Sequence, residues 1–309
     1  MFTKHLFRCS SLGHILVGSV GITDKQRQDI DKLTTRNIKA SRGEEAPLTD
    51  NMRKELSRLC EMRDAPDELS AGVKTHLDDI FRSVFWKRKR LLSNKYLTKG
   101  LWQEEDSLDV VSYNDGKFLA KNKIQYQNDY IQGMPDVAID IVTDTKTSWD
   151  MDTFDNAELT NLYEWQINGY MWLTGLSRGR IVYCLVNAPL HLVQSALLSL
   201  YYQHGQPNQE DGRKYDKWKE EAQQLERNMI FDIPKFQEDN PGYEWENTEL
   251  NFSIPMGMRQ KSFEVQLEDG DIEFIKTRVV MCRTYLQNKY LATMQILNEL
   301  VANQNKNVA

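Results

Sequence analysis

Cysteine and histidine are scarce in this sequence, and the few that occur do not cluster. Cys9, Cys60, Cys184 and Cys282 lie far apart without a CxxC pair, and the five histidines do not accompany them. This spacing argues against a disulfide scaffold and favours a reducing, cytoplasmic setting. It also predicts no zinc site, because structural zinc needs such ligands in close groups.

Long apolar runs and an excess of positive charge are also missing. No stretch approaches the ~18 apolar residues of a membrane span, so we expect no membrane association. The stretch MFTKHLFRCSSLGHILVGSVGI resembles a signal peptide only weakly, because Arg8, Ser10, Ser11 and His14 interrupt it. The formal net charge of -6 gives no global attraction for nucleic acid, so any such binding depends on local groups of lysine and arginine.

The order of apolar patterns predicts a mixed α/β protein. The chain has 309 residues, of which 40% are hydrophobic and 27% charged, as in an ordinary soluble protein with a sizeable core. Residues 23–92 have helical periodicity, 93–188 alternate between helices and strands, and 189–303 are mainly helical. We find no clear boundary, and therefore predict one domain over 1–309, with 23–92 as a helical insertion, 93–188 as the core and 189–303 as a helical C-terminal region.

One predicted helix carries a carboxylate in an unexpected place. The stretch KGLWQEEDSLDVVS at 99–112 has helical spacing, with Leu101, Leu108 and Val111 on one stripe. Glu104 falls on the same stripe, where no partner is evident. It could be an acidic first turn favoured by the helix dipole, or part of a site.

The stretch GMPDVAIDIVTDTKTSWD, residues 133–150, places charges in a pattern otherwise typical of a β-strand. Asp144 and Lys146 are two residues apart, so their side chains point to one face of the strand. If the chain turns back near residues 138–141, Asp136 comes close to Asp144. Buried charge is costly unless it is paired or bound to a metal, and carboxylates are ligands that Mg²⁺ prefers. Alternatively, Asp144 and Lys146 lie on a solvated face of an edge strand.

The following helix, in NAELTNLYEWQINGYMWLTGL, carries Gln166 and Tyr170. Four residues apart on a helix, they share a face that can point toward the carboxylates. They could also be ordinary amphipathic positions. The Lys146 ammonium beside a bound cation could position a water molecule or, if deprotonated, act as its base.

In this order the motifs resemble the PD-(D/E)xK nuclease superfamily, in its RecB-like and lambda-exonuclease-like (YqaJ) branch. The residues that carry the resemblance are G-x-P-D ending at Asp136, D-x-K-T from Asp144, Gly100-x-x-x-Glu104 before them, and Q-x-x-x-Y from Gln166 to Tyr170. The match covers residues 99–174. The resemblance implies a restriction-endonuclease-like core, in which a central mixed β-sheet is flanked by helices.

The resemblance also implies a metal site and a role for each motif residue. The implied ligands of one or two Mg²⁺ ions, which Mn²⁺ could replace, are Glu104, Asp136, Asp144 and the carbonyl of Thr145. Lys146 would orient the attacking water and offset charge on the phosphate, with Gln166 and Tyr170 supporting that geometry. Some RecB-like nucleases hold an iron–sulfur cluster, but the isolated cysteines of this chain predict none.

Two other groups are candidates for contact with DNA. Lambda-type exonucleases carry an N-terminal segment similar to Arg8-Cys9-Ser10-Ser11, whose Arg and Ser residues hold a 5′-phosphate. Arg8, Ser10 and Ser11 could equally be a plain helix cap. The basic run Lys87, Arg88, Lys89 and Arg90 could follow a DNA backbone, or be a solvated face.

The resemblance implies a Mg²⁺-dependent DNA exonuclease, acting 5′→3′ on duplex DNA in phage-type recombination or replication. A structure-specific endonuclease on the same core and a non-catalytic DNA-binding protein on a decayed nuclease fold are the alternatives. Polarity and the choice between DNA and RNA stay open. A phage-encoded protein would work in the cytoplasm of its bacterial host. A recombinase or single-strand annealing partner, and a ring trimer, are implied by resemblance alone.

Overall fold

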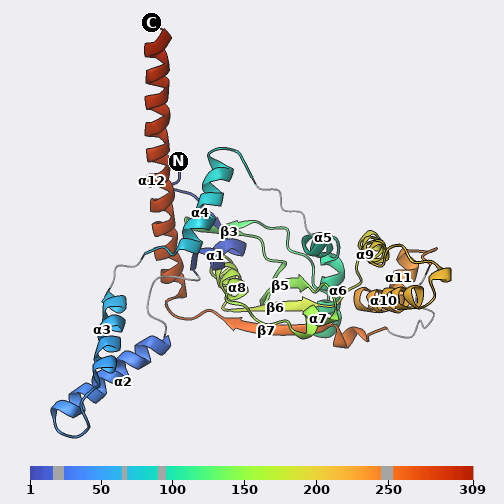
Figure 1. Cartoon of the computed structure of the whole chain (residues 1–309), viewed down its shortest axis with the longest axis horizontal. Coiled ribbons are helices and arrows are strands. Elements are labelled where there is room, and N and C mark those ends of the chain that lie inside the picture. Colours follow the sequence, from blue (N-terminus) through green and yellow to red (C-terminus); the bar gives the residue numbers. More distant parts are fainter. Residues whose placement is uncertain (17–23, 65–67, 90–94, 245–252, 309) are drawn as a thin grey trace. The chain divides into compact units, whose positions relative to one another are not determined.

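A computed structural model describes the chain in two compact units (Figure 1). The described residues are all of 1–309 except 17–23, 65–67, 90–94, 245–252 and 309. The helical unit comprises Met1–His5, His14–Lys89 and Ile275–Ala309, and the sheet unit comprises Leu6–Gly13 and Arg90–Phe274. The division of one domain into 23–92, 93–188 and 189–303 stays a prediction.

The helical unit is built from long, polar helices. They are α2 (Asp24–Ser41), α3 (Asp50–Asp64), α4 (Ala71–Val84) and most of α12 (Asp271–Val308). Helices α2 and α3 pack against each other. Helix α4 begins at a Ser70 cap, whose hydroxyl accepts the amide hydrogen of Val73. Asp78 of α4 accepts hydrogen bonds from Tyr285 and Lys289 of α12, at 3.0 and 2.6 Å.

The sheet unit contains two small mixed sheets. One has the strand order β1-β3-β2 and the other β4-β5-β6-β7. The strands are β1 (Phe7–Arg8), β2 (Tyr126–Gln127), β3 (Ile131–Gly133), β4 (Val137–Ala138), β5 (Val142–Thr147), β6 (Arg178–Cys184) and β7 (Gln260–Gln266). Strands β5 and β6 are parallel, whereas β4 and β7 run antiparallel to their neighbours. The predicted mixed α/β fold is confirmed.

Helices flank these sheets. They are α1 (Cys9–Leu16), which continues past Gly13, α5 (Lys95–Trp102), α6 (Glu104–Asp115), α7 (Met151–Asp155), α8 (Asn161–Thr174), α9 (Leu190–Gln203), α10 (Arg213–Met229) and α11 (Ile233–Asp239), with 3₁₀ turns at Gln209–Asp211 and Met256–Met258. Figure 1 shows α9, α10 and α11 grouped together. Their shared core includes Val193, Met229, Ile230 and Phe236. None of the helices in the described part of the chain has the length and apolarity that a membrane crossing requires.

Helices α6 and α8 cover opposite faces of the larger sheet. Successive side chains of a strand alternate between its faces. Val182 and Cys184 of β6 belong to the core cluster formed with α6. Gly179 of the same strand lies on the face opposite to Val182 and Cys184, against Ile167 of α8. A Cβ atom on Gly179 would come within 2.3 Å of the Ile167 Cγ2 atom. The glycine lets α8 approach the sheet closely.

The prediction of a single helix over 99–112 is wrong, because the helix is interrupted at Gln103. Its backbone leaves the helical region, with φ -111° and ψ 20°, and its Nε2 atom donates to the Asn187 carbonyl at 2.7 Å. A new helix then starts on three acidic residues, which its N-terminus favours. Leu101 therefore lies on α5 and is 77% exposed, while Leu108 is buried on α6.

Candidate active site

The hairpin on which the predicted site depends is present between Asp136 and Asp144. Strand β4 pairs antiparallel with β5, with Val137 opposite Thr143, and residues 139–141 form the turn. The Asp136 Oδ2 atom accepts hydrogen bonds from the Thr145 backbone amide at 2.6 Å and from the Thr145 hydroxyl at 2.8 Å. These bonds fix the Asp136 carboxylate against the strand that carries Asp144 and Lys146.

Asp144 is buried, with 4% of its surface exposed, and two side chains contact its carboxylate. Its Oδ1 atom accepts from Gln166 Nε2 at 3.0 Å. Its Oδ2 atom is ion-paired with the Lys146 ammonium, although Oδ2 accepts no hydrogen bond of good geometry. We regard the ion pair as the dominant contact, because charge attraction depends little on angle. Asp144 is thus held by one directional and one purely electrostatic partner.

Gln166 connects the charged pair to Tyr170. Its Oε1 atom accepts from Lys146 Nζ at 3.3 Å, while Nε2 donates to Asp144 and to the Tyr170 hydroxyl, the latter at 3.2 Å. One amide therefore presents its acceptor to the cation and its donor to the anion. Gln166 and Tyr170 are both buried on α8 and share one face, as the sequence predicts. The Lys146 ammonium also lies 4.6 Å from the centre of the Tyr163 ring.

The electrostatics of the site oppose the burial of its carboxylates. Burial, followed by repulsion from Asp144, raises the pKa of Asp136 to about 7, and Glu104 adds to the repulsion. Burial alone would lower the pKa of Lys146, but the neighbouring Asp144 carboxylate outweighs it and the pKa is raised. The ammonium form of Lys146 is therefore favoured, which suits charge compensation better than proton abstraction.

Glu104 is the first residue of α6 and belongs to the same electrostatic group. Its Oε2 atom lies 2.6 Å from the Lys121 ammonium. The hydrogen bond from Lys121 to Glu104 is the main cause of a raised Lys121 pKa, to which Asp136 also contributes. The loop that carries Lys121 is tied to the hairpin, because the Asn122 amide donates to the Asp136 carbonyl at 2.7 Å.

The donor chemistry of these residues fits a hard divalent cation. Asp144 and Glu104 both repel the Asp136 carboxylate, and a bound cation would relieve that repulsion. Among the described residues, however, no three His, Cys, Asp or Glu side chains converge tightly enough to enclose an ion. Instead, the oxygens contact Lys121, Thr145 and Lys146. Thr145, predicted to offer its carbonyl, contacts Asp136 through its amide and hydroxyl.

The N-terminal candidates lie beside Tyr170. Arg8 ends strand β1, which pairs parallel with β3, and Ser10 and Ser11 begin α1. A cavity of about 300 Å³ lies here and is lined by Arg8, Ser10, Gln132 and Tyr170, among others. Ser11 does not line it, and its hydroxyl donates to the Arg8 carbonyl at 2.8 Å. Two of the three predicted residues thus face a cavity that shares Tyr170 with the carboxylate site.

Three of the four residues of the predicted basic run belong to the described part of the chain. Lys87, Arg88 and Lys89 are exposed and belong to the helical unit. Arg90 lies outside the described residues. A role in DNA contact for the four residues stays a prediction.

Sequence reasoning missed three residues that shape the site. Lys121 is ion-paired with Glu104, and the Tyr163 ring lies beside the Lys146 ammonium. Lys99 of α5 is 1% exposed, and its ammonium donates to the carbonyls of Ser148 and Trp149 at 2.8 and 2.9 Å, just beyond β5. Burial lowers the Lys99 pKa to about 7. Only Tyr163 had a local signal, because it lies one helical turn before Gln166.

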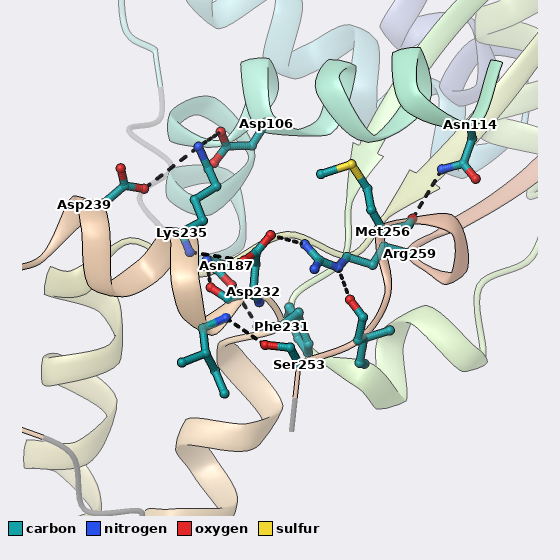
Figure 2. Close-up of polar contacts among 12 residues, drawn as sticks. Asp106, Asn114, Asn187, Phe231, Asp232, Lys235, Asp239, Ser253, Met256 and Arg259 are labelled. Carbon is teal, nitrogen blue, oxygen red and sulfur yellow. Dashed lines mark hydrogen bonds and ion pairs between the residues drawn. The ribbon is translucent and has the colours of Figure 1, made fainter. Parts of the chain in front are cut away.

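A second cluster of charged and polar side chains, which includes Asp106 of α6, is drawn in Figure 2. We call it the Asp232 cluster; it comprises Asp106, Asn187, Asp232, Lys235 and Arg259. Arg259 pairs with Asp232 at 2.8 Å and donates to the Ile254 carbonyl at 2.6 Å. The Asn187 Oδ1 atom accepts hydrogen bonds from the backbone amides of Phe231 and Asp232, each at 2.8 Å. Lys235 pairs with Asp106 at 3.2 Å.

Comparison with solved structures identifies the fold. A phage-related exonuclease from Haemophilus somnus 129PT matches with a TM-score of 0.57 and 19% identity, over 94% of this chain and 97% of that one. An alkaline exonuclease from Laribacter hongkongensis gives a TM-score of 0.46 and 11% identity, over 75% and 88% of the two chains. No protein-family model and no curated protein matches the sequence. The chain shares the fold of the Haemophilus exonuclease, and the resemblance stated from sequence is confirmed at the level of fold.

Proposed function

We propose that this chain is a Mg²⁺-dependent nuclease that hydrolyses phosphodiester bonds, acting as a 5′→3′ exonuclease on duplex DNA. The observation that carries the proposal is the Asp144–Lys146–Gln166–Tyr170 array with Asp136 held across the hairpin. Asp144 is paired with Lys146, but Asp136 has no cationic partner among the described contacts and is repelled by Asp144 and Glu104. The fold shared with a phage-related exonuclease supports the same reading.

Each residue of the array has a role that follows from its contacts. Glu104, Asp136 and Asp144 would hold the cation, with Thr145 fixing the Asp136 carboxylate. When bound, Mg²⁺ supplies Lewis-acid activation of water and stabilisation of the leaving oxygen. The Lys146 ammonium would face the scissile phosphate and offset its growing negative charge. Gln166 would fix the orientation of the Asp144 and Lys146 side chains, and the Tyr170 hydroxyl would fix Gln166.

The cavity beside Tyr170 supports the proposed polarity. Arg8 and Ser10 offer a cation and a hydroxyl at its wall, a combination that suits a terminal phosphate. A 5′-phosphate held there would set the distance from the strand end to the carboxylates. A single-strand annealing partner and a trimeric assembly are part of the proposal by resemblance only.

Digestion of end-labelled linear duplexes with Mg²⁺, with and without a 5′-phosphate, tests the proposal. We expect wild type to release mononucleotides from the 5′-phosphorylated end, and Lys146→Ala to lose activity roughly 10²- to 10³-fold because an electrostatic contact to the phosphate is removed. Lys217→Ala is the matched control, since that exposed lysine of α10 lies in a surface pair with Glu221.

The same assay separates the alternatives. Cleavage of closed circular DNA would indicate an endonuclease instead of an exonuclease. Equal activity of wild type and Lys146→Ala would refute the site assignment. If wild type cleaves nothing and a titration detects no Mg²⁺ or Mn²⁺ binding, the chain is a non-catalytic DNA-binding protein on this fold.

A further inference from the structure

Trp102 and Leu101 form an exposed apolar step at the edge of the candidate active site. They are the last two residues of α5, where Gln103 breaks the helix before Glu104 begins α6. Trp102 is 68% exposed and Leu101 is 77% exposed. Single exposed apolar residues are ordinary, but a neighbouring pair beside a carboxylate is less easily explained by packing.

The pair lines a cavity that also contains charges of the site. The cavity measures about 350 Å³, and its wall is formed by Leu101, Trp102, Glu104, Glu105 and Lys121. It therefore joins an apolar surface to the Glu104–Lys121 ion pair, in which the two atoms are 2.6 Å apart. This volume lies within the range of small-molecule sites, roughly 300–1,000 Å³.

The part of the cavity wall that Lys121 forms is hydrogen-bonded to the segment that leads into the hairpin. The loop carrying Lys121 is bound to the segment before β4, because Asn122 donates through its amide to the Asp136 carbonyl and through Nδ2 to the Pro135 carbonyl, at 2.7 and 3.0 Å. The same loop exposes Lys123 and Ile124. An apolar platform, a cation and the predicted metal ligands are thus held within one unit of the structure.

We propose that Trp102, with Leu101, is a stacking platform for a nucleobase of the substrate strand, and that Lys121 contacts the adjoining phosphate. This inference rests on the proposed nuclease function and adds a binding subsite to it. A nucleobase is a flat, apolar group joined to an anionic phosphate, and the cavity offers an indole face and an ammonium for those two parts. An aromatic ring contacts any base, so the subsite binds without sequence preference.

The local geometry leaves the indole ring available. Its one ring neighbour among the described contacts is His191 of α9, in an edge-on arrangement with centroids 5.4 Å apart. An edge contact leaves a face of the indole open to a base. Because Trp102 is mostly exposed, its truncation should not disturb the core.

The test is a double-mutant cycle between Trp102 and single bases of the DNA. Binding of a 5′-phosphorylated single-stranded 12-mer is measured with Mg²⁺ in the Lys146→Ala background, to prevent cleavage, using oligonucleotides with one abasic position at each site in turn. Trp102→Ala should weaken binding of the intact strand roughly 5- to 150-fold, as expected for one stacked base. At one abasic position the two proteins should bind equally.

Two variants serve as controls. Trp102→Phe should restore most of the affinity, because a phenyl ring also stacks. Tyr202→Ala removes an exposed aromatic residue of α9 and should leave binding unchanged. Thermal unfolding of each variant verifies that the fold is retained.

The outcomes are distinguishable. If Trp102→Ala binds like Tyr202→Ala, or if its loss persists at every abasic position, the stacking platform is refuted while nuclease activity in wild type is untouched. If wild type neither binds nor cleaves DNA, the proposed function itself fails.

Discussion

The candidate active site and the Asp232 cluster both bury charge beside α6, but they balance it differently. In the Asp232 cluster, burial alone would raise the pKa of Asp232, yet hydrogen bonds from Arg259 and the Lys235 amide hold it below its usual range. In the candidate active site, burial and Asp144 raise the pKa of Asp136 to about 7. The Asp232–Arg259 pair stabilises the fold, whereas Asp136 faces like charges whose repulsion a cation could relieve.

This difference teaches how to separate a structural cluster from a functional one. Buried polar groups normally find partners, and Asn187 and Arg259 do so. Around Asp144, by contrast, Oδ2 accepts no hydrogen bond of good geometry. A buried carboxylate with a strongly raised pKa, here Asp136, indicates a site more reliably than charge density alone.

The largest effect should come from neutralising the unbalanced carboxylate. We expect Asp136→Asn to reduce nuclease activity by at least about 10³-fold, since a predicted metal ligand is lost. The melting temperature in metal-free buffer should not fall, because a like-charge repulsion is removed and an amide oxygen can still accept from Thr145. Activity on linear duplex DNA and thermal unfolding in EDTA measure the two effects. A lowered melting temperature would contradict the comparison.

The same substitution in the balanced cluster should have the opposite result. Asp232→Asn leaves the buried Arg259 guanidinium without its carboxylate, and breaking one partner of a buried pair costs about 3–5 kcal/mol. Urea unfolding should show this loss, while activity per folded molecule stays near that of wild type. An unchanged unfolding free energy, or an activity loss as large as that of Asp136→Asn, would remove the distinction between the clusters.

A smaller effect should follow from Lys99, which is buried but is not paired with a carboxylate at short range among its described contacts. Its pKa is about 7 in the fold, against 10.5 for an ordinary lysine side chain, so between these pH values the unfolded chain binds a proton that the folded chain does not. Stability from this group therefore rises with pH in that window, by at most about 1.4 kcal/mol per pH unit.

Lys99→Met provides the test. Unfolding free energies of wild type and variant are compared at pH 6, 8 and 9.5. The difference should shift in favour of wild type as pH rises from 6 to 9.5. A difference that does not change with pH would mean that Lys99 keeps its proton in the fold, held by the Ser148 and Trp149 carbonyls.

Much of the candidate site was predictable because its spacings are local. Asp144 and Lys146 share a strand face, and Gln166 and Tyr170 share a helix face, as periodicity requires. The sequence set the hairpin that brings Asp136 to Asp144 only as a condition of the site, and the structure contains it. The helix over 99–112 was predicted wrongly, because the side chain of Gln103 bonds to Asn187, 84 residues away. No local pattern reveals such a contact.

The sequence by itself determined the mixed α/β class and the residues of the array, because strand and helix periods assign side chains to faces within a few positions. The tertiary structure decided which charges are balanced. It placed Lys121 against Glu104, buried Lys99 under the end of β5, and left Trp102 exposed beside the carboxylates. These outcomes depend on how distant segments pack, since desolvation and charge pairing arise only once the chain is folded.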